Sequence, residues 1–159
     1  MKIIFLDIDG VLNSARYDRI RMENQGNIDE TRLILLKRVV DETGALIVLS
    51  SSWRKYWEKD EVLCDEIGRE INAAFAQYGL AVYDKTACLA SNDRAAEIRM
   101  WLKSRGDVEA FAIFDDLSFG WGADLQEHLV RTNYAVGLGL EEKHVLKSIE
   151  ILKRIDAEK

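Results

Sequence analysis

Two pairs of aspartates stand directly after short apolar runs, and they are the residues of this sequence best suited to carry chemistry. One pair is Asp7 and Asp9, and the other is Asp115 and Asp116. If the pairs converge, their like charges raise the pKa of a carboxyl group or require a counter-ion. Oxygen ligands from carboxylates and a backbone carbonyl, completed by water molecules, suit Mg²⁺. The two pairs therefore predict a magnesium site.

The apolar runs before the aspartates predict buried strands, because a strand covered on both faces is apolar along its whole length. The predicted strands cover residues 2–6, 45–49, 80–83, 110–114 and 129–132. Apolar residues at helical spacing, together with capping residues, predict helices between them. The predicted helices cover residues 30–43, 53–78 and 141–155, and a further one begins after a cap at Ser91 or Asn92. Residues 14–27 are expected to be irregular.

Strands and helices of these lengths alternate along the chain, which is typical of an α/β fold with right-handed crossovers. We expect a three-layer, Rossmann-like parallel sheet with helices on both faces, formed by residues 1–159 as one domain. Ligands of such sheets bind outside the carboxyl ends of the strands. This rule brings residues 50–54 to the same edge of the sheet as the two aspartate pairs.

The composition is that of a globular protein. Apolar residues make up 48% and charged residues 31%, and the net charge is −6. An acidic chain is a poor candidate for a general nucleic-acid coat, which needs a basic face. Asp7 interrupts the first apolar run, so no signal peptide is expected, and no apolar stretch approaches the roughly 20 residues of a membrane span. We expect a cytoplasmic protein with no membrane partner, and nothing in the sequence indicates its oligomeric state.

Several segments resemble the motifs of one enzyme superfamily in order and spacing. FLDIDGVLN (residues 5–13) is similar to the first motif of the haloacid dehalogenase (HAD) superfamily, whose phosphatases carry Asp-x-Asp-Gly after the first strand. LIVLS (residues 46–50) resembles the second motif, and IFDD (residues 113–116) resembles the fourth. SSSWR (residues 50–54) further resembles a small branch without a cap domain, some members of which accompany RNA-repair enzymes.

The resemblance implies a Mg²⁺-dependent phosphatase that works through an aspartyl-phosphate. Asp7 would be the nucleophile and a metal ligand. Asp9 would bind the metal through its backbone carbonyl, protonate the leaving oxygen and later deprotonate the attacking water. Asp116 would bind the metal directly, and Asp115 would be a second ligand or a partner of the ligands. Gly10 would permit the tight backbone path beside the substrate.

Other positions of the motifs imply contacts with the phosphate. Ser50 would donate a hydrogen bond to a phosphoryl oxygen, with Ser51 as the alternative if the strand ends one residue later. The third motif is usually a Lys at the start of a helix, which Arg94 matches here, with Lys85 as the alternative. A cation in the first turn of a helix opposes the helix dipole, so a neighbouring phosphoryl group or aspartate cluster would explain that placement. Arg54 is a candidate to bind a second phosphate.

Lid domains of this superfamily are inserted after the first motif or between the second and the third. Residues 14–44 and 55–91 are too short here for an independent lid. We therefore expect an open site suited to nucleotides, polynucleotide ends or other macromolecular phosphomonoesters. The candidate partner is a nucleic-acid end, and the arginines that would meet such a chain are Arg16, Arg19 and Arg21.

Two other functions share part of this pattern. A receiver-like signalling module also has a parallel sheet, clustered acids and a phosphorylated Asp, and it does not turn over substrates. Receivers place the paired acids after the first strand, whereas here the pair follows the fourth predicted strand, so the order favours a hydrolase. A small-metabolite phosphatase would share the proposed chemistry and differ in its substrate.

Overall fold

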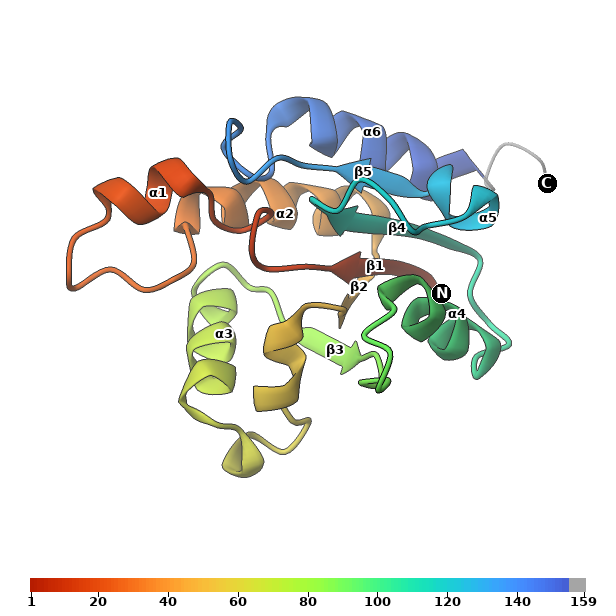
Figure 1. Cartoon of the computed structure of the whole chain (residues 1–159), viewed down its shortest axis with the longest axis horizontal. Helices are drawn as coiled ribbons and strands as arrows, with labels where there is room; N and C mark the ends of the chain where they lie inside the picture. Colours follow the sequence, from red (N-terminus) through yellow and green to blue (C-terminus); the bar gives the residue numbers. More distant parts are fainter. Residues whose placement is uncertain (155–159) are drawn as a thin grey trace.

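The computed structural model describes residues 1–154, and its strands and helices alternate along the chain (Figure 1). The strands are β1 (Lys2–Leu6), β2 (Leu46–Leu49), β3 (Val82–Lys85), β4 (Ala110–Asp115) and β5 (Leu129–Arg131). The α-helices are α1 (Ala15–Ile20), α2 (Glu30–Thr43), α3 (Glu66–Gln77), α4 (Arg94–Lys103), α5 (Ala123–Gln126) and α6 (Glu142–Lys153). Two 3₁₀ helices are η1 (Ser52–Tyr56) and η2 (Glu61–Leu63). Within residues 1–154, no helix is both long and apolar enough to cross a membrane.

The sheet is parallel, and its strand order is β3-β2-β1-β4-β5. β1 lies in the centre, and its last residue, Leu6, pairs with residues near the ends of both β2 and β4. Parallel strands run in one direction, so their carboxyl ends meet at one edge of the sheet. The strand order therefore brings Asp7, Ser50 and Asp115 together at that edge.

Helices cover both faces of the sheet and give three layers (Figure 1). Side chains of a strand point alternately to the two faces. Ile4 and Leu6 of β1 belong to a core cluster with residues of α2, α3 and α6. Ile3 and Phe5 belong to a second cluster with residues of α4 and α5. The predicted three-layer α/β fold is confirmed.

The segment 53–78, which was predicted to be mostly helical, is divided into several helices. It contains η1, η2 and α3, joined by short connections. The side chain of Asp60 accepts a hydrogen bond from the backbone N–H of Val62 and so starts η2. The carbonyl of Tyr56 accepts from the N–H of Asp65, just before α3. These local bonds take up backbone groups that a continuous helix would use, so the chain turns back on itself.

Two elements escape the apolar pattern. α1 lies in the segment that was expected to be irregular, where Ser14 caps it by accepting a hydrogen bond from the N–H of Tyr17. None of its residues is buried. β3 begins at Val82 rather than at residue 80, and all of its residues are only half-buried. A surface helix and an edge strand lack the continuous apolar run that marks buried elements.

Capping residues set the helix ends with mixed agreement. α2 begins after Asp29 and ends before Gly44, as predicted. The cap of α4 is Asp93, whose side chain accepts a hydrogen bond from a backbone N–H of the first turn, instead of the expected Ser91 or Asn92. The predicted end of the last helix, at residue 155, lies outside the described residues.

The backbone of α3 approaches η1 at Gly68, so a methyl group at this position is expected to destabilise the fold. A Cβ atom on Gly68 would lie 2.2 Å from the carbonyl oxygen of Tyr56. Alanine ordinarily stabilises a helix by about 1 kcal/mol relative to glycine, but here the overlap would force two backbones apart. We expect Gly68→Ala to lower the free energy of unfolding by about 1–3 kcal/mol, as measured by thermal denaturation.

Gly106→Ala is the matched control, because a Cβ atom at Gly106 meets no atom within 4 Å. Its melting temperature is expected to stay the same or to rise slightly. A Gly68→Ala variant that is as stable as this control would contradict the close contact between α3 and η1.

Candidate active site

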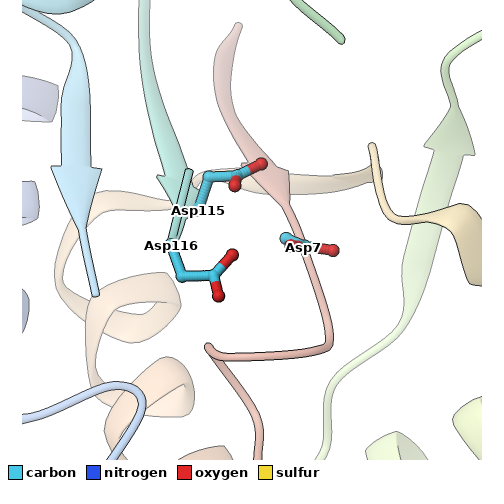
Figure 2. A group of neighbouring side chains, drawn as sticks. All are labelled: Asp7, Asp115 and Asp116. Atoms are coloured by element: carbon cyan, nitrogen blue, oxygen red, sulfur yellow. The ribbon is translucent and has the colours of Figure 1, made fainter. Parts of the chain in front are cut away.

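Three aspartates meet at the carboxyl edge of the sheet, after β1 and at the end of β4 (Figure 2). Asp7, Asp115 and Asp116 each offer a carboxylate oxygen, and these oxygens lie within 4.8 Å of one another. Asp7 and Asp115 are buried, and Asp116 is half-buried. The backbone N–H of Asp7 donates to the carbonyl of Phe114, which fixes the end of β1 against β4. The two acidic pairs thus converge, and three of the four aspartates share one cluster.

The chain leaves β1 through a turn that requires glycine at position 10. Gly10 has a φ of +84°, and a Cβ atom there would lie 2.4 Å from Oδ2 of Asp116. Its N–H donates to Oδ1 of Asn13 (2.9 Å), and its carbonyl accepts from Oγ1 of Thr132 (2.6 Å). Gly10 therefore shapes the site by leaving room for Asp116. Sequence reasoning missed Asn13 and Thr132, which hold the turn.

Arg94 is the cation that contacts the cluster. It begins α4, and its Nη1 lies 2.6 Å from Oδ2 of Asp115 and 2.9 Å from Oδ2 of Asp7. The alternative for this position, Lys85, lies elsewhere, because its Nζ donates to backbone carbonyls of the η1 region and to the carboxylate of Glu58. The contacts therefore favour Arg94 as the basic residue of the site.

The cluster carries more negative charge than Arg94 neutralises. The pKa of Asp7 is raised to about 7, chiefly by burial and then by the charge of Asp115, while Arg94 acts in the opposite direction. Burial and the charge of Asp115 also raise the pKa of Asp116. Carboxylates raise one another's pKa in this way when too little positive charge lies between them. Crowded carboxylate oxygens with surplus negative charge suit a divalent cation such as Mg²⁺, so these residues fit the implied metal.

The two aspartates of the second pair have different partners. Asp115 accepts from Arg94 through Oδ2, and its Oδ1 accepts from the backbone N–H of Leu117 at 2.9 Å. Asp116 is less buried, and its carboxylate lies beside that of Asp7 (Figure 2). Asp116 is therefore better placed to meet a cation directly, and Asp115 is better placed to orient Arg94.

The serines after β2 also differ. Ser50 is fully buried, and its Oγ has no hydrogen-bond partner within the described part of the chain. A buried hydroxyl without a partner is costly, and an anionic oxygen near the cluster would supply one. The Oγ of Ser51 instead accepts a hydrogen bond from the N–H of Trp53 at 3.2 Å and caps η1. Ser50 is the better candidate for a phosphate contact.

Arg54 corrects a prediction. Its side chain is only 6% exposed, and its guanidinium pairs with the carboxylate of Glu97 in α4 at 2.6 Å. Its other hydrogen bonds go to the backbone carbonyls of Ser50, Ser51, Thr86 and Ala87. A guanidinium has five N–H donors, and these five hydrogen bonds occupy all of them. The expectation that Arg54 binds a phosphate is therefore wrong in this conformation, because no donor is left for a ligand.

Asp9 lies at the rim, outside the cluster of three. Its carboxylate accepts a hydrogen bond from the indole Nε1 of Trp53 (3.0 Å) and another from Nδ2 of Asn13 (2.9 Å). Trp53 was not among the site residues predicted from the sequence. No local spacing links a residue of η1 with a residue of the first turn, so this contact could be found only from the structure.

The comparison with known families agrees with this geometry. The family described as "HAD domain in Swiss Army Knife RNA repair proteins" matches residues 3–145 of the 159. The chain belongs to this family. No curated protein and no solved structure matches it significantly. Membership as an HAD domain indicates hydrolase chemistry in general, and the acidic cluster of the domain can hold a metal ion.

Removal of the crowded carboxylate of Asp7 is expected to stabilise the metal-free domain at alkaline pH. The pKa of Asp7 is about 7 in the folded protein against 3.8 for the free group, so the folded state binds more protons between these values. The stability of the wild type therefore falls as the pH rises through this window. We expect Asp7→Asn to raise the melting temperature at pH 8 in a chelator, with a smaller gain at pH 5.

The upper limit of this gain is about 4 kcal/mol, since each unit of pKa difference corresponds to about 1.4 kcal/mol. Asp7→Asn also removes one ion-pair partner of Arg94, which reduces the gain in stability. Asp124→Asn is the control, because a hydrogen bond from Arg99 lowers the pKa of Asp124 to about 2. Its contribution is present above the unfolded pKa, so its removal must not stabilise the domain at pH 8. An Asp7→Asn gain that is equal at both pH values would contradict the crowding of the cluster.

Proposed function

We propose that this HAD domain is a magnesium-dependent phosphomonoester hydrolase that works through an aspartyl-phosphate intermediate. The observation that carries the proposal is the cluster of Asp7, Asp115 and Asp116 around Arg94, beside the unpartnered hydroxyl of Ser50. A phosphate ester and the carboxylates are all anionic, so the ester can approach them only where positive charge offsets the negative charge of both groups. The family match supports this reaction over that of a receiver-like signalling module.

Three groups are the candidates to hold Mg²⁺: the carboxylates of Asp7 and Asp116 and the backbone carbonyl of Asp9. When bound, the ion offsets the charge of the nucleophile and of the ester and orients a phosphoryl oxygen. Asp115 supports this set by fixing Arg94, which it contacts at 2.6 Å. We propose magnesium because all the donors are oxygens and only a few come from the protein. Mg²⁺ usually keeps several of its water ligands when it binds to a protein.

The two acids of the first turn divide the proposed reaction between them. An oxygen of Asp7 attacks the phosphorus atom while the bond to the leaving oxygen breaks in line with it. Asp9 donates its proton to the leaving oxygen, and an alcohol departs. A water molecule then gives a proton to Asp9 and attacks the phosphorus, which breaks the bond to Asp7. Inorganic phosphate leaves, and both aspartates return to their starting states.

Arg94 and Ser50 are the candidates to stabilise the phosphoryl group during both steps. Arg94 places a fixed positive charge beside Asp7, where negative charge gathers on the phosphoryl oxygens. The hydroxyl of Ser50 is buried next to the end of β1, and a phosphoryl oxygen would be its first partner. Both side chains are thereby held before the substrate arrives.

The reaction is tested by the hydrolysis of p-nitrophenyl phosphate with Mg²⁺ and with a chelator. We expect activity only with the metal, and a loss of at least about a thousandfold in kcat for Asp7→Asn, because the nucleophile is removed. Asp124→Asn, at an exposed aspartate of α5 that lies outside the motifs, is expected to keep its activity. Turnover that survives both chelation and Asp7→Asn would exclude the proposed mechanism.

The shape of the site favours large substrates. The segment after the first motif contributes one short helix, α1, and the carboxylate of Asp9 is exposed at the rim. Arg16 and Arg19 of α1 are exposed as well, whereas Arg21 is half-buried and donates to Asn27. Exposed cations beside a site can bind the phosphates that flank a terminal one. Together with the RNA-repair family, this supports polynucleotide ends as the substrates.

This substrate class is tested with 5′- and 3′-phosphorylated oligonucleotides against mononucleotides and sugar phosphates. We expect the highest kcat/KM for an oligonucleotide, and a KM raised about three- to tenfold by the double change Arg16→Ala and Arg19→Ala at low salt. The same double variant is expected to hydrolyse p-nitrophenyl phosphate normally. The double change Arg38→Ala and Lys147→Ala, in α2 and α6, removes the same number of positive charges and is the control. A preference for sugar phosphates would support a small-metabolite phosphatase and leave the chemistry intact.

A further inference from the structure

We propose that Trp53 and Asn13 are positioning residues that hold the carboxylate of Asp9 on the leaving-group side of the site. This inference rests on the proposed function, because it concerns the acid of the phosphatase reaction. It also assigns a role to Trp53, a half-buried tryptophan of η1 that is far in sequence from the first turn.

Each oxygen of the Asp9 carboxylate has its own donor. Nε1 of Trp53 donates to Oδ2 at 3.0 Å, and Nδ2 of Asn13 donates to Oδ1 at 2.9 Å. An exposed aspartate otherwise exchanges freely among rotamers, so two donors from different segments restrict its orientation. A carboxylate oxygen has two lone pairs, so each oxygen keeps a site for a proton while it accepts one hydrogen bond.

The direction in which the two donors hold Asp9 matches the needs of the reaction. In an in-line displacement, the attacking and leaving oxygens lie on opposite sides of the phosphorus. An acid that protonates the leaving oxygen must therefore lie further out than the nucleophile. Asp7 is buried in the cluster, whereas Asp9 is exposed and is held outside it. Without the donors, the carboxylate is free to turn toward solvent or toward the cluster.

The donors themselves are fixed by the fold. Oγ of Ser51 accepts from the backbone N–H of Trp53 and caps η1 at its start. The next residue, Arg54, is buried, and its guanidinium donates to the backbone carbonyls of two serines after β2 and of Ala87 after β3. Asn13 is buried too, and its Oδ1 accepts from the N–H of Gly10. The indole and the amide therefore present rigid donors to a side chain that would otherwise be mobile.

The test compares leaving groups, because the need for an acid rises with the basicity of the departing oxygen. Values of kcat/KM, which report the steps through departure of the alcohol, are measured for p-nitrophenyl phosphate, phenyl phosphate and an alkyl phosphate. We expect Trp53→Phe to lower kcat/KM about tenfold for the alkyl ester and by less than about threefold for the nitrophenyl ester. Asp9→Asn is expected to show the same pattern with larger losses.

Trp57→Phe is the matched control, since it removes an indole donor that bonds to Oδ1 of Asn72 and not to Asp9. A general loss of structure lowers kcat/KM by the same factor for every ester. We expect any effect of Trp57→Phe to be equal for the three esters in this way. If Trp53→Phe also lowers all three esters equally, the positioning role is excluded.

A second measurement does not depend on turnover. The sequence contains four tryptophans, and each is expected to give one indole N–H signal in a ¹H–¹⁵N spectrum. The Trp53 signal is assigned as the one that is missing from the spectrum of Trp53→Phe. If this variant does not fold, the signal is assigned by triple-resonance methods. We expect Asp9→Asn to shift the Trp53 signal and to leave the Trp57 signal in place. An unmoved Trp53 signal overturns the inference. If the signal moves but the wild type hydrolyses none of the esters, the contact stands and the proposed function fails.

Discussion

Three carboxylates are forced together at one end of a parallel sheet, and much of the architecture of the site follows from their repulsion. β1 and β4 are neighbouring parallel strands, so the residues at their carboxyl ends must lie close together. Packing of the strands between two layers of helices outweighs the electrostatic cost of burying Asp7 and Asp115 there. Arg94 reduces that cost from the first turn of α4, although a cation at this place opposes the helix dipole. A position that is unfavourable for an isolated helix is favourable beside the cluster.

The same edge separates its acids by depth. Asp7 lies inside with Arg94, Asp116 lies at half-depth, and Asp9 lies at the rim with donors of its own. Asp7 and Asp9, which are separated by a single residue in the chain, thereby have very different surroundings. Both residues belong to the turn that follows β1, and Gly10 closes this turn with a left-handed backbone that leaves room for Asp116. Residues of one type can then perform different tasks.

Sequence reasoning recovered the buried part of this arrangement well. Fully apolar runs predicted β1 and β4, and the rule that parallel strands end at one edge of the sheet placed the aspartates at that edge. Contacts that follow no periodic pattern of residues were not predicted from the sequence. Arg54 was expected to bind a second phosphate, whereas its ion pair with Glu97 of α4 holds it in the interior. Trp53 of η1 contacts Asp9, and Thr132, just after β5, contacts Gly10, and pairings between such distant segments leave no pattern in a single sequence.

Arg54 also determines how the edge of the site can move. Its guanidinium joins the backbone after β2, the backbone after β3 and, through Glu97, helix α4. Opening α4 alone would leave the buried guanidinium without its counter-ion, which costs several kcal/mol, and opening either backbone segment would leave some of its N–H donors without their carbonyl partners. Local unfolding at this edge is therefore cooperative, and the three segments are expected to exchange their protected amide hydrogens together. This edge of the sheet is therefore expected to open as one unit rather than segment by segment.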